Sequence, residues 1–281
     1  MRTKSLPYLL LAPSLIFLVF LFLYPFVMVA VQSFTDRGAY SLKNYEEMFG
    51  HWKFGTTFWN TIFLTAAIVP LQLLFALSMA KLVSGLTTGR DTILYIFAIP
   101  LGISDLAVGI IWLAIFEQSG FLNSWLMGLG VIDQPIILLG FENKWVIFIA
   151  IMLAEIWRAT AIMMVIIVAG MGLVPKEYNE AGEVFGANAW QRFTRITLPL
   201  IRPSLQTALI LRVILAFEVF AVVIVLGGSN FPVLMSEVYH WQFVLRDNGV
   251  AAAFAIVILA LSIVSTLAIM RVLRVPKEAQ I

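Results

Sequence analysis

Six long apolar runs limit what this chain can fold into. Each is long enough to cross the hydrocarbon of a bilayer, which takes about 20 residues of helix. Lipid offers no hydrogen-bond partner to backbone N–H and C=O groups, so each run is predicted to be a helix. We therefore predict an all-α, polytopic membrane protein with six transmembrane helices. The runs are Leu9–Phe34, Phe58–Ala80, Thr92–Phe116, Lys144–Met171, Pro203–Leu226 and Val250–Val272.

The composition excludes several other classes of protein. Hydrophobic residues make up 61% of the chain and charged residues only 12%, a balance that would leave too much apolar surface in water. The formal net charge of +2 gives no nucleic-acid footprint. The absence of cysteine excludes disulfides and cysteine-ligated metals. His51 and His240 are isolated, so no metal site is expected.

The first apolar run also has features of a secretory signal peptide, because Arg2 and Lys4 precede it. However, it is too long for the apolar core of such a peptide and no small-residue cleavage site follows. Tyr24-Pro25 also interrupts it. We expect a retained first helix and a single membrane domain over residues 1–281.

The distribution of positive charge orients the chain, because Lys and Arg concentrate in cytoplasmic loops. With a cytoplasmic N-terminus, eleven Lys and Arg residues fall inside and five fall outside. Both termini are therefore predicted to be cytoplasmic. Two short interfacial helices are expected in the outer loops, at Phe121–Leu129 and Tyr239–Leu245, with Trp125 and Trp241 at headgroup depth.

The segment Val174–Leu205 is the longest polar stretch, and it lies between two apolar runs on the predicted cytoplasmic side. Val174-Pro175 ends one helix and starts a short amphipathic one over Lys176–Phe185. Gly186 and Ala187 break it. Asn188 is then expected to cap a second helix, Ala189–Thr197, with Gln191 completing a capping box and Leu198-Pro199 ending it. Such a pair fits either a docking part for a soluble partner or a simple membrane-surface connector.

Five charged residues lie inside the apolar runs, where charge is costly. Glu155 and Arg158 are three apart on one helix and can pair, whereas Arg212 and Glu218 need partners elsewhere. These groups either line a translocation route or fix helix packing. The five residues are Asp105, Glu155, Arg158, Arg212 and Glu218.

Two local features accompany these charges. Asp105 follows Pro100 and Gly102, so the third helix is expected to kink or unwind there. Phe217 and Phe220 beside Glu218 fit either stacking faces for a sugar ring or ordinary core.

Gly227-Gly228-Ser229 ends the fifth run. The glycines allow a tight outer turn or a helix C-cap.

The polar segment resembles the EAA signature of permease subunits of binding-protein-dependent ABC importers. That signature is Glu-Ala-Ala, three residues, Gly, nine residues, Ile, one residue and Leu-Pro. Glu180-Ala181, Gly186, Ile196 and Leu198-Pro199 stand at the matching positions. Gly182 replaces the second alanine, and Phe185 stands where many sugar permeases have Asp. Further matches to the carbohydrate-uptake branch include Leu11-Ala12-Pro13, Tyr24-Pro25, Asn60-Thr61, Gly227-Gly228-Ser229 and Gly249-Val250-Ala251-Ala252-Ala253.

The resemblance implies an importer of two permeases, normally two different ones, and two ATPase subunits, fed by a sugar-binding protein. ATP and magnesium belong to the ATPases, and this chain is expected to bind no cofactor. It implies a location in the cell inner membrane. The binding protein is expected to face Gly227, Gly228 and Ser229. The ATPase-docking residues that it implies are Tyr178, Glu180, Ala181, Phe185, Gly186 and Trp190.

Carbohydrate would then be the substrate, with Asp105, Arg158, Arg212, Phe217, Glu218 and Phe220 as candidate pathway residues. The chain carries no Walker A motif and no catalytic triad, so a non-catalytic permease is expected. The alternative is a secondary transporter that uses Asp105, Glu155 and Glu218 as proton or sodium sites. A membrane enzyme or scaffold is a third reading, but no residues supply its chemistry.

Overall fold

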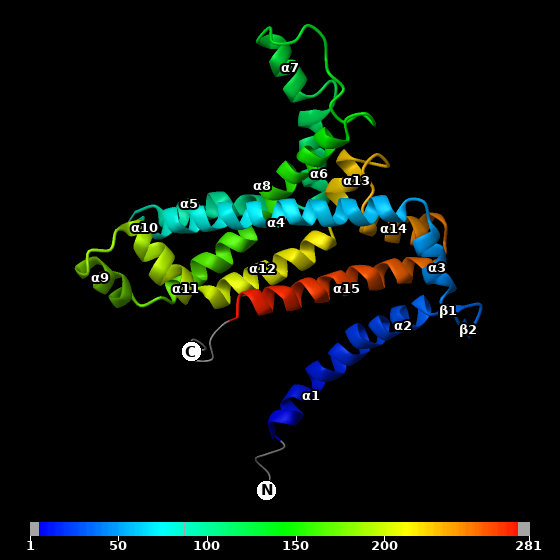
Figure 1. The fold of residues 1–281 in the computed structure, drawn as a ribbon, viewed down its shortest axis with the longest axis horizontal. Helices are drawn as coiled ribbons and strands as arrows, with labels where there is room; N and C mark the ends of the chain where they lie inside the picture. The colour runs from blue at the N-terminus through cyan, green and yellow to red at the C-terminus, as the bar shows by residue number, and fades with distance from the viewer. Residues whose placement is uncertain (1–5, 87, 275–281) are drawn as a thin grey trace. The chain divides into compact units, whose positions relative to one another are not determined.

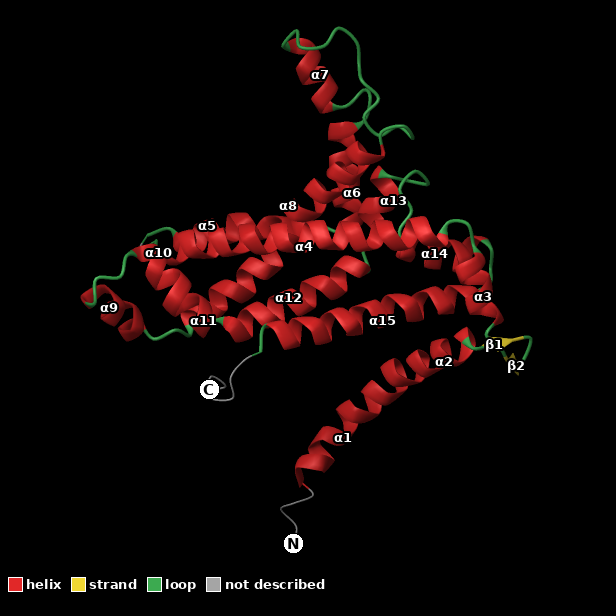
Figure 2. Cartoon of the chain, in the orientation of Figure 1, coloured by secondary structure: helices red, strands yellow, loops and turns green. Residues whose placement is uncertain are grey.

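A computed structural model describes residues 6–86 and 88–274 of the chain. The described part is mostly helical (Figures 1 and 2). It divides into two compact units, residues 6–55 with 234–259 and residues 56–233 with 260–274. Arg2 and Lys4, the charges that precede the first run, lie outside the described residues.

Five helical stretches are long and apolar enough to cross a membrane. A sixth stretch passes the same test only as a pair of helices bent by 72° at a short break. The all-α prediction is therefore confirmed, and the number of spans is five or six. The five stretches are Leu10–Ser33, Phe54–Ser84, Asp105–Gly128, Lys144–Gly172 and Asn248–Val272.

The first unit begins with a long helix that has no buried residue in its most hydrophobic window. A two-residue β-hairpin follows, in which Thr35 pairs with Tyr40. Arg37 and Gly38 both have positive φ, as a tight hairpin turn requires. The elements of this unit are α1 (Leu6–Leu18), η1 (Val19–Leu23), α2 (Tyr24–Ser33), β1 (Thr35–Asp36), β2 (Ala39–Tyr40), α3 (Lys43–Gly50), α14 (Leu234–Tyr239), η4 (His240–Val244) and the first half of α15 (Asn248–Val272).

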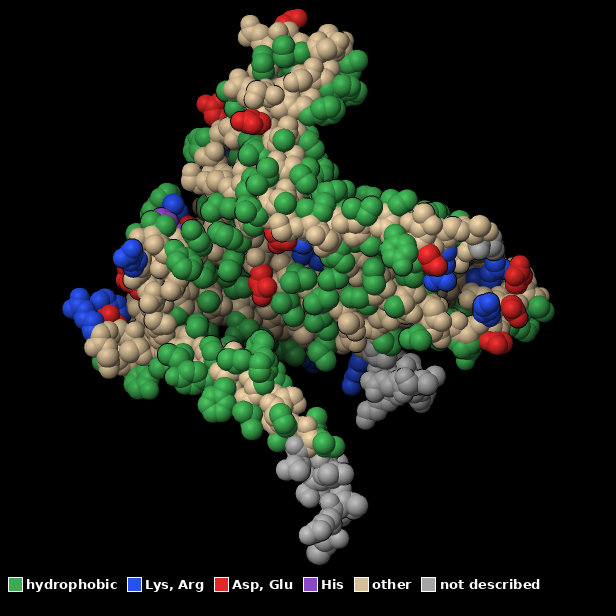
Figure 3. Space-filling view, turned by 180° about the vertical axis from the view of Figure 1, so that it is seen from behind, with side chains coloured by type: hydrophobic (Ala, Val, Ile, Leu, Met, Phe, Trp, Pro, Cys, Tyr) green, Lys and Arg blue, Asp and Glu red, His purple; other side chains and the backbone are tan. Residues whose placement is uncertain are grey.

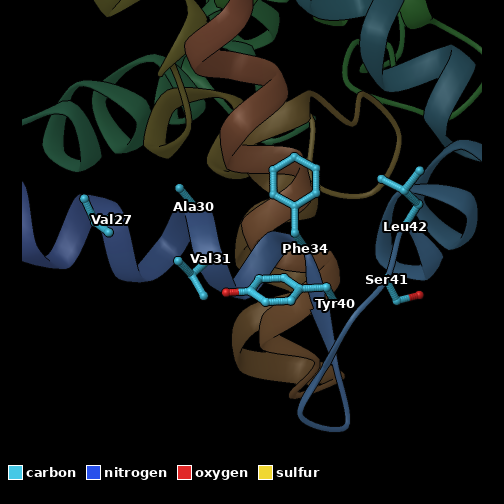
Figure 4. A pocket seen from close by; sticks show the side chains of 7 residues that line it. All are labelled: Val27, Ala30, Val31, Phe34, Tyr40, Ser41 and Leu42. Carbon is cyan, nitrogen blue, oxygen red and sulfur yellow. The ribbon is translucent and has the colours of Figure 1, made fainter.

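Asn44 of α3 ties the junction of this unit together. Its side-chain amide donates hydrogen bonds to the carbonyls of Gln32, Ser33 and Thr35 at 3.1–3.2 Å. A Cβ at Gly249 would lie 2.6 Å from the same amide, so the first turn of α15 needs glycine there. Beside this junction, Val27, Val31, Phe34 and Tyr40 help to line a recess of about 600 Å³ (Figure 4).

The first helix continues through Tyr24-Pro25, as expected for the single predicted helix over Leu9–Phe34. The turn Val19–Leu23 is a π-helix, and the Tyr24 N–H bonds the carbonyl of Val19 instead of the residue four back. In this wider turn the hydrogen bonds reach five residues back instead of four. Pro25, which has no N–H to donate, comes directly after the turn. The helix therefore continues through the proline.

Both predicted interfacial segments are helical, but only the first is a separate short helix. The first is α7 (Phe121–Gly128), with Trp125 55% exposed. The second is part of a longer stretch formed by α14 and η4, and Trp241 there is buried, with its ring 5.4 Å from that of His51. The Trp241 indole therefore packs inside its own unit, and its depth in the membrane stays a prediction.

The second unit is built around α8, whose apolar window is the most buried of the candidate spans. Two apolar clusters lie along it, one with Ile147 and Ile151 and the other with Met163 and Ile167. The helices of this unit are α4 (Phe54–Ser84), α5 (Arg90–Ala98), η2 (Ile99–Gly102), α6 (Asp105–Phe116), α7, α8 (Lys144–Gly172), α9 (Lys176–Val184), α10 (Ala189–Arg192), η3 (Phe193–Thr197), α11 (Leu198–Leu200), α12 (Arg202–Phe217) and α13 (Ala221–Leu226).

Two predicted spans are broken in the structure. The third run divides into α5, the short 3₁₀ turn η2 and α6, which confirms the break expected before Asp105. The Ser104 side chain accepts a hydrogen bond from Ala107 and caps the new helix. The fifth run, predicted as one helix, ends at Phe217 and restarts at Ala221. That prediction was wrong because neither proline nor glycine marks the break.

Candidate functional site

The polar segment forms two short helices, and the residues between them cap the end of the first helix and the start of the second. The helix α9 ends at Val184, and Gly186, which follows the C-cap Phe185, has a φ of +80° that favours glycine. Asn188 then accepts from the Gln191 N–H at 2.8 Å, and the Gln191 side chain accepts from the Asn188 N–H at 2.9 Å. The expected capping box is confirmed.

Gly182 allows the two helices to approach closely. A Cβ at this position would lie 2.7 Å from the Ile196 Cδ1 and 3.4 Å from the Arg192 Cγ. The glycine is buried and α9 remains regular around it. The Arg192 guanidinium also pairs with Glu183 at 3.4 Å. The departure from Glu-Ala-Ala at Gly182 thus has a packing reason.

The second helix does not stop at Leu198-Pro199 as predicted. It continues from α10 through the π-helical turn η3 and α11 to Leu200, and the bend of 72° falls at Ile201. The Leu198 N–H bonds the Phe193 carbonyl, five residues back, and Pro199 follows it. A π-turn therefore precedes and accommodates this proline, as it does at Pro25.

The predicted docking residues share one property, which is exposure. Phe185 is 89% exposed, Trp190 63% and Tyr178 54%. Val184, which the sequence analysis did not select, is 86% exposed beside them. Glu180, Ala181 and Gly186 are exposed as well. Large exposed apolar side chains are typical of surfaces that contact another protein or the membrane.

Lys81 links the segment to the end of α4, and sequence reasoning missed it. Its ammonium lies 4.5 Å from the centroid of the Trp190 ring and 4.9 Å from that of Phe193. Cation–π contacts of this kind are attractive. Spacing along the sequence gave no signal, because 109 residues separate Lys81 from Trp190.

The charges of the apolar runs meet in one network on α8. Arg212 of α12 donates to Glu155 at 2.8 Å, and both side chains are fully buried. Arg158 pairs with Glu155 at 3.4 Å and with Asp105 of α6 at 2.9 Å. The structure thus brings together four of the five predicted intramembrane charges. It identifies Asp105 as the partner of Arg158, which sequence alone did not.

Gln72 of α4 completes this network and was also missed. Its amide donates to the Glu155 carbonyl at 2.7 Å, and its side-chain oxygen accepts from the Arg212 Nε. A lone glutamine in the run Phe58–Ala80 was the available signal. The network forms a polar layer between the two apolar clusters of the unit, so it fixes the register of the four helices α4, α6, α8 and α12.

Glu218, Phe217 and Phe220 flank the break between α12 and α13. Phe217 is buried, Phe220 is half-buried and Glu218 is exposed. Within residues 6–86 and 88–274, Glu218 forms no ion pair, so the structure does not join it to the network.

Gly227, Gly228 and Ser229 form the turn that follows α13. A Cβ at Gly227 would lie 2.8 Å from that of Phe231, and Gly228 has a φ of +51°. The helix-cap reading therefore holds for the two glycines. Gly228 and Ser229 are also exposed, which leaves them accessible to a partner.

Comparisons with a protein family and with individual proteins both match this chain to membrane components of transport systems. The family described as "binding-protein-dependent transport system inner membrane component" matches residues 72–274. The sulfoquinovosyl glycerol transport system permease protein of Agrobacterium fabrum is 31% identical over 96% of this chain and 91% of its own length. The arabinooligosaccharides transport system permease protein of Bacillus subtilis is 30% identical over 94% and 87%, respectively.

A solved structure has the same fold. It is a bacterial alginate ABC transporter in complex with an alginate pentasaccharide-bound periplasmic protein. One of its chains aligns with a TM-score of 0.83 at 20% identity, covering 97% of this chain and 95% of that one.

Proposed function

Because the chain belongs to the family of binding-protein-dependent transport system inner membrane components, we propose that it forms half of the translocation pathway of an ATP-driven sugar importer. The observation that carries the coupling role is the helix pair α9–α10, braced by its own caps and exposing Tyr178, Phe185 and Trp190. A rigid, apolar surface on a short connector suits transmission of force to a soluble subunit.

The substrate class rests on the relatives. Those described above transport a sulfoquinovosyl glycerol and arabinooligosaccharides, and both are carbohydrate derivatives. We infer a carbohydrate substrate for this chain as well.

Six transmembrane helices are the proposed topology, with α10 to α12 forming the fifth. The Lys and Arg distribution supports cytoplasmic termini and a cytoplasmic α9–α10 pair in the cell inner membrane. In Figure 3, charged side chains gather over the end that holds α9 and α10, and further charged groups lie elsewhere on the surface.

The proposed mechanism is alternating access. ATP binding closes two partner ATPases, which hold the nucleotide and magnesium, and the docked helix pair moves with them. The helices then rock from an inward-open to an outward-open state. An extracytoplasmic binding protein delivers the sugar, with Gly228 and Ser229 as its proposed contact. A second, different permease supplies the other half of the pathway.

Two candidate pathway residues fit this role better than the others. Asp105 is half-exposed and Glu218 is exposed, and each lies at a helix break. Unwound backbone at such breaks can contact substrate. Arg212 and Phe217 are buried in this conformation, and Arg158 is held between two carboxylates. We assign those three to packing, together with Phe220 beside the break.

The secondary-transporter alternative has less support. Two of its three proposed ion-binding carboxylates, Asp105 and Glu155, are paired with arginine. Such a carrier also has no use for an exposed helix pair of this kind.

The docking role is tested with two substitutions, Glu180→Lys and Gly186→Val. Each alters the exposed face of the pair, so both are expected to lose ATPase co-purification and sugar uptake while the chain still inserts into the membrane.

Matched controls exist on the loop between α7 and α8. Glu142→Lys makes the same charge change, and Gly130→Val introduces the same strain because Gly130 has a φ of +69° in open space. Both controls are expected to keep the ATPase. Wild-type assembly of the two test variants would refute the docking role.

A further inference from the structure

A charged recess lies behind the helix pair, where α9 and α10 face the ends of α4, α5 and α8. Its volume is about 580 Å³. All the residues that line the recess belong to the second unit. Four cationic side chains line it, namely Lys81, Arg90, Lys176 and Arg192, together with two acidic ones, Glu180 and Glu183.

The positive charges in this recess are only partly neutralised. Arg192 pairs with Glu183 at 3.4 Å, and Lys81 faces the rings of Trp190 and Phe193. Arg90 and Lys176 form no ion pair with any residue in the described part of the chain. Glu180 is the remaining acid for both, so the recess keeps a positive excess that favours an anion.

The level of the recess along the helices narrows the choice of anion. Lys81 and Ser84 lie in the last turns of α4, and Met171 and Gly172 at the end of α8. These are the ends of two candidate membrane spans, where phospholipid headgroups are found. Leu82 and Leu173, 72% and 84% exposed, lie on the same helix ends. A cationic recess beside exposed leucines matches an amphiphile rather than a small soluble anion.

We propose that this recess binds a phosphate group presented by an anionic phospholipid headgroup. Arg90 and Lys176 contact the phosphate, and the exposed leucines meet the acyl chains. The bound lipid then fills the space between the helix pair and the span ends. This site shares no residue with the proposed sugar pathway, and it shares only Glu180 with the proposed ATPase-docking residues.

The test measures retained lipid by native mass spectrometry of the full chain from nanodiscs. The nanodiscs contain phosphatidylethanolamine with or without phosphatidylglycerol. The wild type is expected to retain phosphatidylglycerol selectively. Arg90→Gln combined with Lys176→Gln is expected to weaken retention roughly tenfold or more, since each basic residue near an anionic lipid contributes to its attraction.

Arg195→Gln combined with Arg271→Gln is the matched control, because these two arginines lie outside the recess and the net charge changes equally. The control is expected to retain lipid as the wild type does. Equal losses in both double variants would mean general surface attraction and would overturn the proposal, as would wild-type retention in the recess variant.

Two further arms separate other sources of the anion. Inorganic phosphate added to the nanodiscs is expected not to displace the lipid at physiological concentration. Displacement by phosphate alone would point to a soluble anion site. If the recess variant lost only ATPase association, with lipid retention unchanged, the recess would be a protein contact instead. Either result overturns the proposal.

Discussion

The polar segment α9–α10 and the polar layer on α8 treat the same kinds of residue in opposite ways. In the segment, most charged side chains are exposed, and Phe185 and Val184 have almost no cover. In the layer, Glu155, Arg212 and Gln72 are fully buried and bond one another. Polar groups are therefore exposed in one region, where we propose that they meet a partner, and they hold helices together in the other. Substitutions in the segment are therefore expected to change assembly with the ATPase, and substitutions in the layer are expected to change the stability of the fold.

Glu155→Gln is expected to have the largest effect. It keeps the shape but leaves the buried Arg212 without its counter-charge, a loss of about 3–5 kcal/mol for a broken buried pair. The thermal unfolding temperature in detergent should fall sharply, with Glu183→Gln on the exposed segment as an unaffected control. Unchanged unfolding in Glu155→Gln would show that the layer does not hold the helices together.

The double variant Glu155→Leu with Arg212→Met sharpens this result. Replacing both charges by apolar groups of similar volume is often close to neutral, so it should recover much of the lost stability. A double variant as unstable as the single one would mean that the remaining charge, Arg158, also depends on Glu155.

Gly170→Ala is expected to cost about 1–3 kcal/mol through overpacking. Its Cβ would overlap the Ser204 side chain, because α8 and α12 touch there with almost no side chain between them. Gly172→Ala, two residues away with nothing within 4 Å of its Cβ, is the control. Equal unfolding temperatures for the two variants would contradict the close contact.

Asn188→Ala removes the cap of α10, which is worth about 1 kcal/mol of local helix stability. Hydrogen exchange should rise in α10, and Asn188→Ser should restore protection because serine caps as well. Exchange that stays the same in Asn188→Ala would mean that packing against Gly182 alone fixes the pair.

Phe185→Asp should have the smallest effect on unfolding, within about 0.5 kcal/mol, because the ring is almost fully exposed. ATPase co-purification should nevertheless be lost. Lys43→Gln, at an exposed pair with Asp36, is a control for which both stability and association are expected to persist. A Phe185→Asp protein that is destabilised but still binds the ATPase would show that Phe185 supports the fold and not the docking contact.

Apolar length and turn residues predicted most of the fold. Five long helical stretches, the break before Asp105 and the Asn188 capping box all follow from local signals such as Pro100, Gly186 and Gln191. The failures also have local causes. The π-turn that carries the helix through Pro199 depends on a shifted hydrogen-bond ladder, which leaves no mark in the composition. The break after Phe217 has no glycine or proline to announce it.

The candidate sites were predictable to different degrees. The exposed segment could be found because its motif is contiguous. The buried layer joins residues from α4, α6, α8 and α12, so the sequence showed the charges but not which of them pair. Gln72 and Lys81 were missed for the same reason, since their partners lie far away along the chain.

The bend at Ile201 has a mechanical consequence. With α11 and α12 meeting at 72°, a displacement along the axis of α10 and α11 is mostly transverse to α12. Such a stroke would swing α12 sideways instead of pushing it endwise through the lipid. The stiffness of the bend at Ile201 would then set how much of the displacement of α10 and α11 is transmitted to the far end of α12.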